Sequence, residues 1–336
     1  MKRINYYILF LLCCLSLGAY GQNPSVCNYI MSRTYTKANG LENRANIDYY
    51  DGLGRLSGTT LVGAAPSGKD IVTRKDYNTL GRLWREWLPR TSEHSNGKQL
   101  TPVEFASLSA GGYDNDSHTY SKTIYENSPL DRIIEQYGPG TDWYDNGKSA
   151  TTTYQTNISG NLALNCKFYH IGGFHQHPAL DKNSNYATGE LYVTEMKNED
   201  GNTSYEFKDK LGQVILNRQM AGDTTYDTYY VYDDFGMLCF VLPPLMDEEE
   251  ITQTKLDELA YQYKYDVRHR CIAKKLPGCE WVYYIYDKAD CLIFSQDGNR
   301  RQAGEWMFSI PDIFGKECIS GICSNSFDAF SAPLDS

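Results

Sequence analysis

The stretch Tyr50-Asp51-Gly52-Leu53-Gly54-Arg55-Leu56 recurs, with substitutions, along most of the chain. Its pattern is an aromatic residue, an Asp or Asn, two variable residues, a glycine, a cation and an apolar residue. Close copies begin at Tyr77, Phe207 and Tyr232, and looser copies begin at Tyr265, Tyr286 and Pro311. The sequence therefore predicts a β-repeat protein.

Each copy has the chemistry of a tight turn between two strands. The aromatic residue ends a strand, the Asp or Asn oxygen caps the turn, and the cation and the apolar residue open the return strand. Glycine is favoured because a Cβ is penalised at positive φ, and His269 and Asp290, which replace it in two copies, tolerate that conformation better than most residues. The residues predicted to build the turns are Tyr50, Asp51, Gly54, Arg55, Tyr77, Asn78, Gly81, Arg82, Asp209, Gly212, Tyr232, Asp233, Gly236, Tyr265, Asp266, Tyr286, Asp287, Asp312 and Gly315.

The spacing of the copies suits two short strands and two turns per unit. Neighbouring copies begin 27 residues (50 to 77), 25 (207 to 232), 21 (265 to 286) and 25 (286 to 311) apart. Residues 84–206 hold one degenerate copy, Tyr125 to Ile133, but alternate like strands at 149–158 and 190–196. The expected fold class is mostly β, built from antiparallel hairpins, with no firm domain boundary in residues 23–323.

Two short helices are expected to interrupt the repeats. Thr101 and Glu104 form a capping box around Pro102, which predicts a helix up to Leu108. After Pro243-Pro244, the run Asp247–Glu250 is expected to cap about three helical turns, with Ile251, Leu256, Leu259 and Ala260 on one face. Covering a sheet edge or end is the favoured role of this second helix, and binding a partner is the alternative.

Residues 1–22 have the composition of a secretory signal peptide. Lys2 and Arg3 precede an apolar run from Ile8 to Leu17, and Ala19-Tyr20-Gly21 is a small-x-small cleavage site. A lipoprotein signal at Cys13 or Cys14 is disfavoured because Leu11-Leu12 precede these cysteines. We expect export to the periplasm, the outer cell surface or the medium.

The charge balance argues against a nucleic-acid partner. The formal net charge is −10, and removal of Lys2 and Arg3 with the signal makes it −12. Nucleic-acid binding depends on a cationic surface that neutralises phosphates.

Eight cysteines follow the signal segment, namely Cys27, Cys166, Cys239, Cys271, Cys279, Cys291, Cys318 and Cys323. Cys239, Cys271, Cys291 and Cys318 follow repeat turns, where an apolar strand residue is expected. They are therefore interpreted as buried small hydrophobes or as members of cross-strand disulfides. No C-x-x-C pair occurs, which disfavours a metal site, and the spacing does not define a pairing.

Three stretches imitate binding motifs. Gly63 to Asp70 nearly spells a phosphate-binding loop, but Asp70 stands where a hydroxyl is needed and a strand-like run follows. His170, His175 and His177 could bind zinc or copper only with a further ligand from elsewhere. Asp181, Asn183 and Asn185 alternate like a calcium loop, yet Tyr186 occupies the glycine position.

The repeated Tyr-Asp-x-x-Gly-Arg-Leu resembles the YD repeat of the RHS repeat family of exported bacterial proteins. Flanking segments also resemble a domain of unknown function that precedes those repeats in one branch; these are Tyr49–Leu56, Tyr125–Ile133, Glu206–Arg218, Lys274–Gly278 and Tyr286–Gly298. The resemblance implies an open, curved sheet that is part of an RHS-type shell, which in many members encloses a C-terminal toxin or other polymorphic domain. Longer members carry an Asp-Pro-x-Gly segment, but no Asp-Pro dipeptide occurs here.

The sequence therefore predicts a non-catalytic wall segment, too short to form a shell, with no cofactor and no metal. Its expected partners are the rest of such a shell or a toxin cargo, and residues 324–336 are expected to be a C-terminal tail. The last strands should self-associate through their free edge. The alternatives are a surface module that binds glycans or proteins through its tyrosines and, less favoured, an exported hydrolase.

Overall fold

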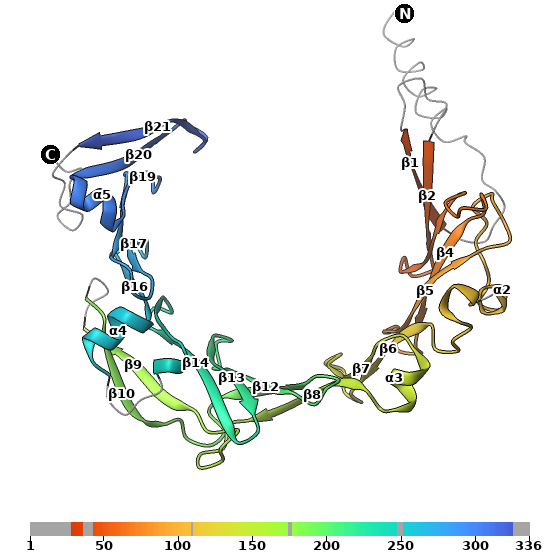
Figure 1. Cartoon of the computed structure of the whole chain (residues 1–336), viewed down its shortest axis with the longest axis horizontal. Helices are drawn as coiled ribbons and strands as arrows, with labels where there is room; N and C mark the ends of the chain where they lie inside the picture. Colours follow the sequence, from red (N-terminus) through yellow and green to blue (C-terminus); the bar gives the residue numbers. More distant parts are fainter. Residues whose placement is uncertain (1–27, 36–42, 109, 174–176, 247–250, 325–336) are drawn as a thin grey trace, which may run out of the picture. The chain divides into compact units, whose positions relative to one another are not determined.

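The computed structural model of the protein describes residues 28–35, 43–108, 110–173, 177–246 and 251–324 (Figure 1). The expected signal peptide, Cys27, His175, the run Asp247–Glu250 and residues 325–336 lie outside these ranges. The chain divides after Ser149 into two compact units. The sequence offered no boundary there, because the same turn chemistry occurs on both sides of it.

The first unit is a ladder of seven antiparallel strands, each paired with the next along the chain. The strands are β1 (Asn28–Tyr35), β2 (Asn43–Tyr50), β3 (Leu56–Leu61), β4 (Ile71–Tyr77), β5 (Leu83–Thr91), β6 (Tyr120–Tyr125) and β7 (Ile133–Tyr137). Between them lie the helices α2 (Pro102–Ser107) and η1 (Gly111–Tyr113), and α3 (Thr141–Asp145) follows β7.

The second unit continues the same construction. Its strands are β8 (Ser149–Thr156), β9 (Lys167–Gly172), β10 (Ala179–Asn185), β11 (Tyr192–Lys197), β12 (Thr203–Lys208), β13 (Val214–Ala221), β14 (Thr224–Tyr232), β15 (Leu238–Leu242), β16 (Tyr261–Tyr265), β17 (Cys271–Lys275), β18 (Val282–Tyr286), β19 (Leu292–Gln296), β20 (Glu305–Pro311) and β21 (Glu317–Ser324). Strand β8 pairs with β11, and from β11 to β21 each strand pairs with the next. Strands β9 and β10 form a separate hairpin. The helices are η2 (Pro244–Met246), α4 (Gln253–Leu259) and α5 (Gly298–Ala303).

These ladders confirm the predicted fold class, a mostly β protein of antiparallel hairpins. Two short helices were expected, and the described ranges also contain α3 and α5, which the sequence did not predict. The ladders are open: in the part of the chain that the structure describes, β1 pairs only with β2 and β21 only with β20. No helix within the described ranges is both long and apolar enough to cross a membrane.

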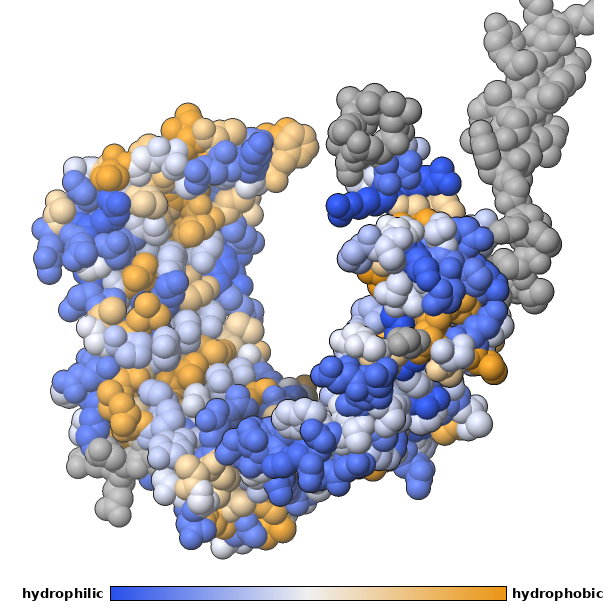
Figure 2. All heavy atoms as spheres, turned by 45° about the vertical axis from the view of Figure 1, so that its right-hand side comes forward, coloured by the Kyte–Doolittle hydropathy of each residue, from blue (hydrophilic) through white to orange (hydrophobic). Residues whose placement is uncertain are grey.

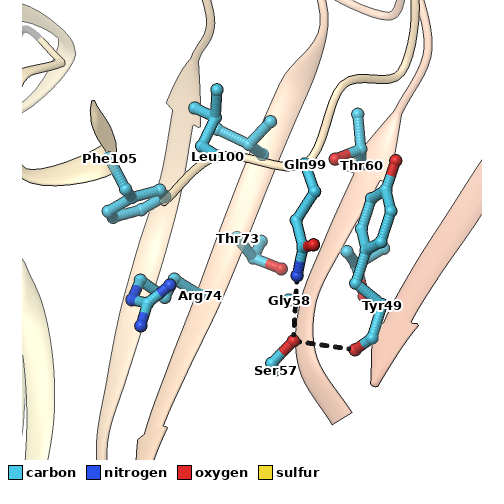
Figure 3. A pocket seen from close by; sticks show the side chains of 11 residues that line it. Tyr49, Ser57, Gly58, Thr60, Thr73, Arg74, Gln99, Leu100 and Phe105 are labelled. Carbon is cyan, nitrogen blue, oxygen red and sulfur yellow. Dashed lines mark hydrogen bonds between the residues drawn. The ribbon is translucent and has the colours of Figure 1, made fainter. Parts of the chain in front are cut away.

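The core of the first unit lies where the segment after β5 folds back over the strands. Phe105 of α2 is 2% exposed and packs with Val72 and Leu100. Beside them, Gln99 reaches across Gly58 to donate to the Ser57 hydroxyl at 3.4 Å, as Figure 3 shows. The space left there is about 20 Å³, about enough for one water molecule. The segment from Gln99 to Phe105 therefore covers this face of the strands.

The capping box of α2 is as predicted from the sequence. The Thr101 hydroxyl accepts the Glu104 N–H, and the Glu104 carboxylate accepts the Thr101 N–H at 2.8 Å. These bonds satisfy backbone donors that the first helical turn leaves without a partner.

The second unit has the larger core. The β9–β10 hairpin and α4 pack on strands β11 to β15 through sixteen buried residues, among them Phe207, Leu216, Leu242 and Leu256. Because Leu256 lies in this core, α4 packs against the sheet. This position favours the expected covering role of the helix over partner binding.

The predicted start of α4 was wrong. Its N-cap is Thr252, whose hydroxyl accepts the Lys255 N–H, and Ile251 precedes the helix. The acidic run 247–250 resembled a capping box. The helix instead begins after Thr252, which caps it, and Leu256 lies on the face that enters the core.

Candidate functional site: the repeat turns

All seven predicted copies form turns with one hydrogen-bond pattern. In the first turn the Asp51 N–H donates to the Arg55 carbonyl at 2.9 Å, and the Gly54 N–H donates back to the Asp51 carbonyl at 3.0 Å. The Asp51 Oδ1 atom accepts the N–H groups of Leu53 and Arg55 at 2.9 and 3.0 Å. The turns that begin at Asn78, Asp209, Asp233, Asp266, Asp287 and Asp312 repeat all four bonds.

The fourth residue of every turn is left-handed, which explains the glycine. The φ angles are +77° at Gly54, +82° at Gly81, +85° at Gly212, +79° at Gly236 and +78° at Gly315. His269 at +62° and Asp290 at +65° adopt the same conformation without glycine, and Asp131 at +55° does so in the lengthened turn after Tyr125.

Each turn also shifts the strand register by one residue. Tyr49 lies opposite Gly58 whereas Tyr50 lies opposite Leu56, so Ser57 is the extra residue of a β-bulge. The same shift occurs at Tyr77, Tyr125, Lys208, Tyr232, Tyr265, Tyr286 and Pro311. The geometry is a tight turn followed by a bulge with a left-handed residue, which increases the local twist of the strands.

The repeat tyrosines join one copy to the preceding copy. The Tyr77 hydroxyl donates to the Leu56 carbonyl at 2.9 Å, across one full repeat. The hydroxyls of Tyr125, Tyr265 and Tyr286 make the same bond to the carbonyls of Leu83, Leu238 and Cys271, at 2.7, 2.9 and 2.9 Å. The tyrosine therefore does more than end a strand: it fixes the spacing of neighbouring hairpins.

The repeat arginines join one copy to the next. The Arg55 guanidinium pairs with its own Asp51, donates to the Gly81 carbonyl at 3.0 Å and lies 4.3 Å from the centre of the Tyr77 ring. Arg270 does the same with Asp266, the Asp287 carbonyl and the Tyr286 ring. Arg82 reaches the Glu126 and Ser128 carbonyls, and Gln213 reaches the Gly236 carbonyl at 3.2 Å. The sequence predicted only that this residue opens a strand, because the next turn is more than twenty residues away.

The turn carboxylates are held in their charged form. Hydrogen bonds from the Arg55 backbone and side chain lower the pKa of Asp51 below its ordinary value. At Asp266, burial opposes ionisation, yet the hydrogen bonds from Arg270 outweigh it and lower the pKa. These groups are therefore acceptors in the turn at neutral pH and are unsuited to act as proton donors.

A further turn with the same hydrogen bonds was missed by the sequence analysis. Asn198 to Asn202 makes the same four bonds, and Gly201 has φ of +87°. It lies between β11 and β12, at the opposite end of the strands from the repeat turns, and shows no register shift. Lys197 and Thr203 replace the aromatic and apolar residues, so only the Asn-x-x-Gly spacing could have indicated it.

A buried arginine anchors the inserted segment of each unit. Arg90 donates to the carbonyls of Phe105 and Leu108 at the end of α2 and to the Thr119 hydroxyl. Arg218 pairs with buried Asp227 at 2.6 Å and donates to the carbonyls of Leu162, Ala163 and Asn165. Both arginines donate hydrogen bonds to backbone carbonyl groups at the end of a helix or in a loop.

The stretch Gly63–Asp70, which resembles a phosphate-binding loop, is a structural loop. The buried Asp70 carboxylate accepts the N–H groups of Gly63 and Gly97, each at 2.8 Å, which ties two loops together. Between them, Ala65 to Lys69 makes the backbone bonds of the repeat turn, and Gly68 has φ of +73°.

The residues proposed for metal binding are not brought together. His170 lies on β9 opposite Asp181, with 3.7 Å between their Nε2 and Oδ2 atoms, and His177 lies in the following loop. Asp181, Asn183 and Asn185 belong to strand β10, not to a calcium loop. Within the described ranges, no three His, Cys, Asp or Glu residues are grouped as metal ligands.

The shifted carboxyl groups of the described ranges all favour the charged form. Every Asp or Glu pKa that departs from its ordinary value there is lowered, whereas a general acid needs a raised one.

The seven cysteines that the structure describes are all unpaired. Cys166 and Cys239 are fully buried in the core of the second unit, and burial raises the pKa of Cys239 to about 12. This agrees with the prediction of a small buried hydrophobe for Cys239. Cys271, Cys291 and Cys318 do not follow it, because they are partly or fully exposed.

Known proteins resemble this chain in two ways: a family model matches part of its sequence, and solved structures share its fold. A family model described as a domain of unknown function, DUF6443, matches residues 26–156. No curated protein is significantly similar to the chain.

Solved structures that resemble this chain include complexes named TcdB2-TccC3 and a Tc holotoxin pore. The structure of TcdB2-TccC3-Cdc42 has a TM-score of 0.59 at 13% identity, over 93% of this chain and 14% of that one. TcdB2-TccC3 without its hypervariable C-terminal region gives 0.58 at 13% identity, with the same coverage. The Photorhabdus luminescens Tc holotoxin pore carrying a TccC3 mutation gives 0.57 at 13% identity, over 90% of this chain and 13% of that one. The chain thus shares the fold of a part of these structures and spans about one seventh of their length.

Proposed function

We propose that this chain is a non-catalytic wall segment of an exported RHS-like protein. One observation carries the proposal: Tyr77, Tyr125, Tyr265 and Tyr286 bond to the preceding copy and Arg55, Arg82 and Arg270 bond to the next, so the recurrent residues of the repeat join hairpins into a sheet instead of forming a pocket. In the larger protein this wall would encase or display a C-terminal toxin domain. The fold shared with TcdB2-TccC3 supports this role.

The edge strand β21 tests the wall role directly. A wall segment should accept a further hairpin there, because β21 has an unpaired side in the described chain and its Ile319 and Ile322 are 58% and 55% exposed. Inserting a second copy of residues 297–324 after Ser324 supplies such a hairpin from the chain's own sequence. We expect the β21 amides to become strongly protected from hydrogen exchange.

Two outcomes would contradict the wall role. The β21 amides of the unmodified chain could already exchange as slowly as those of β13, or the inserted hairpin could leave them unchanged. A matched insertion with Gly315 and Asp312 of the added copy replaced by alanine is the control, because it cannot form the turn.

Export is the second part of the proposal. If residues 1–22 are a cleaved signal, the chain recovered from the periplasm or medium should begin near Gln22 and have the corresponding mass. Recovery of the intact chain from the cytoplasm alone would contradict export without affecting the wall role.

A glycan-binding module is the second candidate, favoured by one cleft. A cleft of about 370 Å³ lies beside the turn at Asp209, with Phe168 and Tyr186 packed edge to face at 4.8 Å and Glu190 nearby. An aromatic wall with carboxylates suits a sugar ring. Binding on a glycan array that is lost in Phe168→Ala and kept in Tyr154→Ala would favour this candidate.

A further inference from the structure

The tips of the repeat turns carry large apolar residues that the turn itself does not need. The third residue contributes only its backbone N–H to the turn, yet its side chain is 78% exposed at Leu53, 72% at Leu80, 84% at Leu211 and 87% at Phe314. Phe235 is 59% exposed, and its ring centre lies 5.2 Å from that of His269 in the next turn. Rows of exposed apolar side chains mark interaction surfaces.

Turns of the same geometry at the opposite ends of the strands provide an internal comparison. The turns at Ala65–Lys69 and Asn198–Asn202 make the same backbone bonds, but their tips are Pro66-Ser67 and Glu199-Asp200. The turn geometry therefore tolerates polar tips. The apolar tips are a property of one margin of the sheet, the margin to which the repeat turns belong.

In the second unit the apolar residues at the second and third turn positions form one row, which we call the tip row: Leu211, Phe235, Val267, Ile313 and Phe314. The other second and third positions hold Lys210, Asp234, Arg268, Lys288 and Ala289. The turns that carry them connect β12 to β13, β14 to β15, β16 to β17 and β20 to β21. The first three lie two strands apart, about 10 Å, and the last lies four strands beyond the third because the β18–β19 turn stands between them. Val267 and Ile313 are 84% and 92% exposed. The space-filling view shows other apolar side chains scattered among polar ones over the face in view (Figure 2).

The same margin also contains a hollow. The turn at Asp287 has Ala289 at its tip, and Cys291 and Pro311 stand where the repeat has Arg and Tyr. Without those two groups, a cleft of about 620 Å³ opens between β19 and β20, lined by Ala289, Cys291, Ile293, Phe294, Ile310 and Ile313. It is lined mainly by apolar side chains and is large enough for a phenyl ring.

A row that contains both projecting tips and an apolar hollow is self-complementary. Phe235 lies in the turn that precedes the turn of Val267. The cleft lies just beyond the turn at Asp287, which follows the turn of Val267. A two-fold axis near Val267 therefore places Phe235 of each copy at the cleft of the other, which is the reciprocal arrangement of an isologous dimer.

The size of the row agrees with such a dimer. With about 150–200 Å² for each large apolar side chain, the exposed fractions of the five tips correspond to roughly 700 Å² per copy, near the ~800 Å² that each partner contributes to a standard interface. We propose that the tip row is a dimerisation surface whose occupant is a second copy of this chain. The proposal does not depend on the wall role.

Sedimentation velocity of the purified full chain over a range of concentrations tests it. We expect a monomer–dimer equilibrium that Phe235→Asn shifts at least tenfold toward monomer. Cys291→Arg, which restores the repeat arginine and fills the cleft, should have the same effect. Two variants should leave the equilibrium unchanged: Asp200→Leu, which adds an apolar tip at the opposite margin, and Ile322→Lys, which changes the β21 edge.

A cross-link distinguishes this contact from any other. Phe235→Cys should form an intermolecular disulfide with Cys291 under oxidised glutathione, and the additional change Cys291→Ser should abolish it. Thermal unfolding verifies that each variant is folded. A chain that stays monomeric at all concentrations, or a dimer that survives both Phe235→Asn and Cys291→Arg, would overturn the proposal.

Discussion

A single left-handed residue determines the path of the chain at every repeat turn. At Gly54 a Cβ would have open space around it, with no heavy atom within 4 Å, so only the φ of +77° disfavours a side chain there. The penalty is therefore one of backbone conformation and not of packing.

We predict that Gly54→Ala lowers the free energy of unfolding by about 1–2 kcal/mol. Gly52→Ala in the same turn is the matched control, because its surroundings are equally open and its φ is not left-handed; its effect should be within about 0.5 kcal/mol. Urea denaturation of the two variants measures both values. Equal losses would show that the turn tolerates a left-handed alanine.

The lowered pKa values of two turn carboxylates and of Glu104 in the α2 capping box lead us to predict a loss of stability in acid. The folded-state pKa values of Asp51 and Asp266 are lowered from their ordinary value of 3.8, and that of Glu104 is lowered from 4.5 to about 2. Because the folded state then binds fewer protons than the unfolded state, this stabilisation is complete above about pH 4.5 and is lost as the pH falls toward 2. Thermal midpoints measured between pH 5 and pH 2 should therefore decrease.

Asn78 supplies the control for this acid effect. Its amide oxygen accepts the N–H groups of Leu80 and Arg82 at 3.0 and 2.9 Å, as the Asp51 carboxylate does for its own turn. The double variant Asp51→Asn, Asp266→Asn should therefore keep both turns and show a shallower acid dependence. An unchanged slope would assign the acid effect to other carboxylates.

At the scale of elements, inserted segments are held by buried arginines. Arg90 on β5 is 7% exposed and anchors the end of α2, so the six-residue helix depends on it as much as on its own capping box. A short helix has little stability by itself.

We predict that Arg90→Met destabilises the protein by about 2–4 kcal/mol, because it removes the arginine donor from the Leu108 carbonyl, the Thr119 hydroxyl and the Phe105 carbonyl, of which the last also accepts the Leu108 N–H. Amides of residues 101–108 should lose protection from hydrogen exchange before those of β4. Arg44→Met on the exposed start of β2 is the control and should change stability by less than about 0.5 kcal/mol. Equal protection in both variants would contradict the anchoring role.

At the scale of the whole molecule, the ends of the ladders are exposed strands. All eight residues of β1 are exposed, and β21 alternates Ile319 and Ile322 with small residues and has a single charged side chain, Glu317. Such edges favour strand addition and aggregation.

We predict that Ile319→Lys raises the concentration at which the chain begins to aggregate, with little change in its unfolding temperature. Static light scattering measures the onset. Leu245→Lys is the control, because Leu245 is more exposed, at 73%, but lies in η2 and not on an edge strand. Equal effects of the two lysines would indicate that added charge, and not the edge, is responsible.

The sequence alone determined the turns, and from the turns the fold class. Asp51, Gly54 and their equivalents act through bonds within five residues, so their roles are readable from local spacing, and the left-handed His269 and Asp290 could be predicted in the same way. The capping box of α2 is local for the same reason.

The tertiary structure decided everything that joins distant residues. The bonds from Tyr77 to Leu56 and from Arg55 to Gly81, and the anchors at Arg90 and Arg218, all depend on which strands become neighbours. So does the hollow beside Cys291, which exists because two substitutions twenty residues apart meet in space. Local hydrogen bonds are encoded by residue type and spacing, whereas contacts between repeats are fixed only when the strands pair.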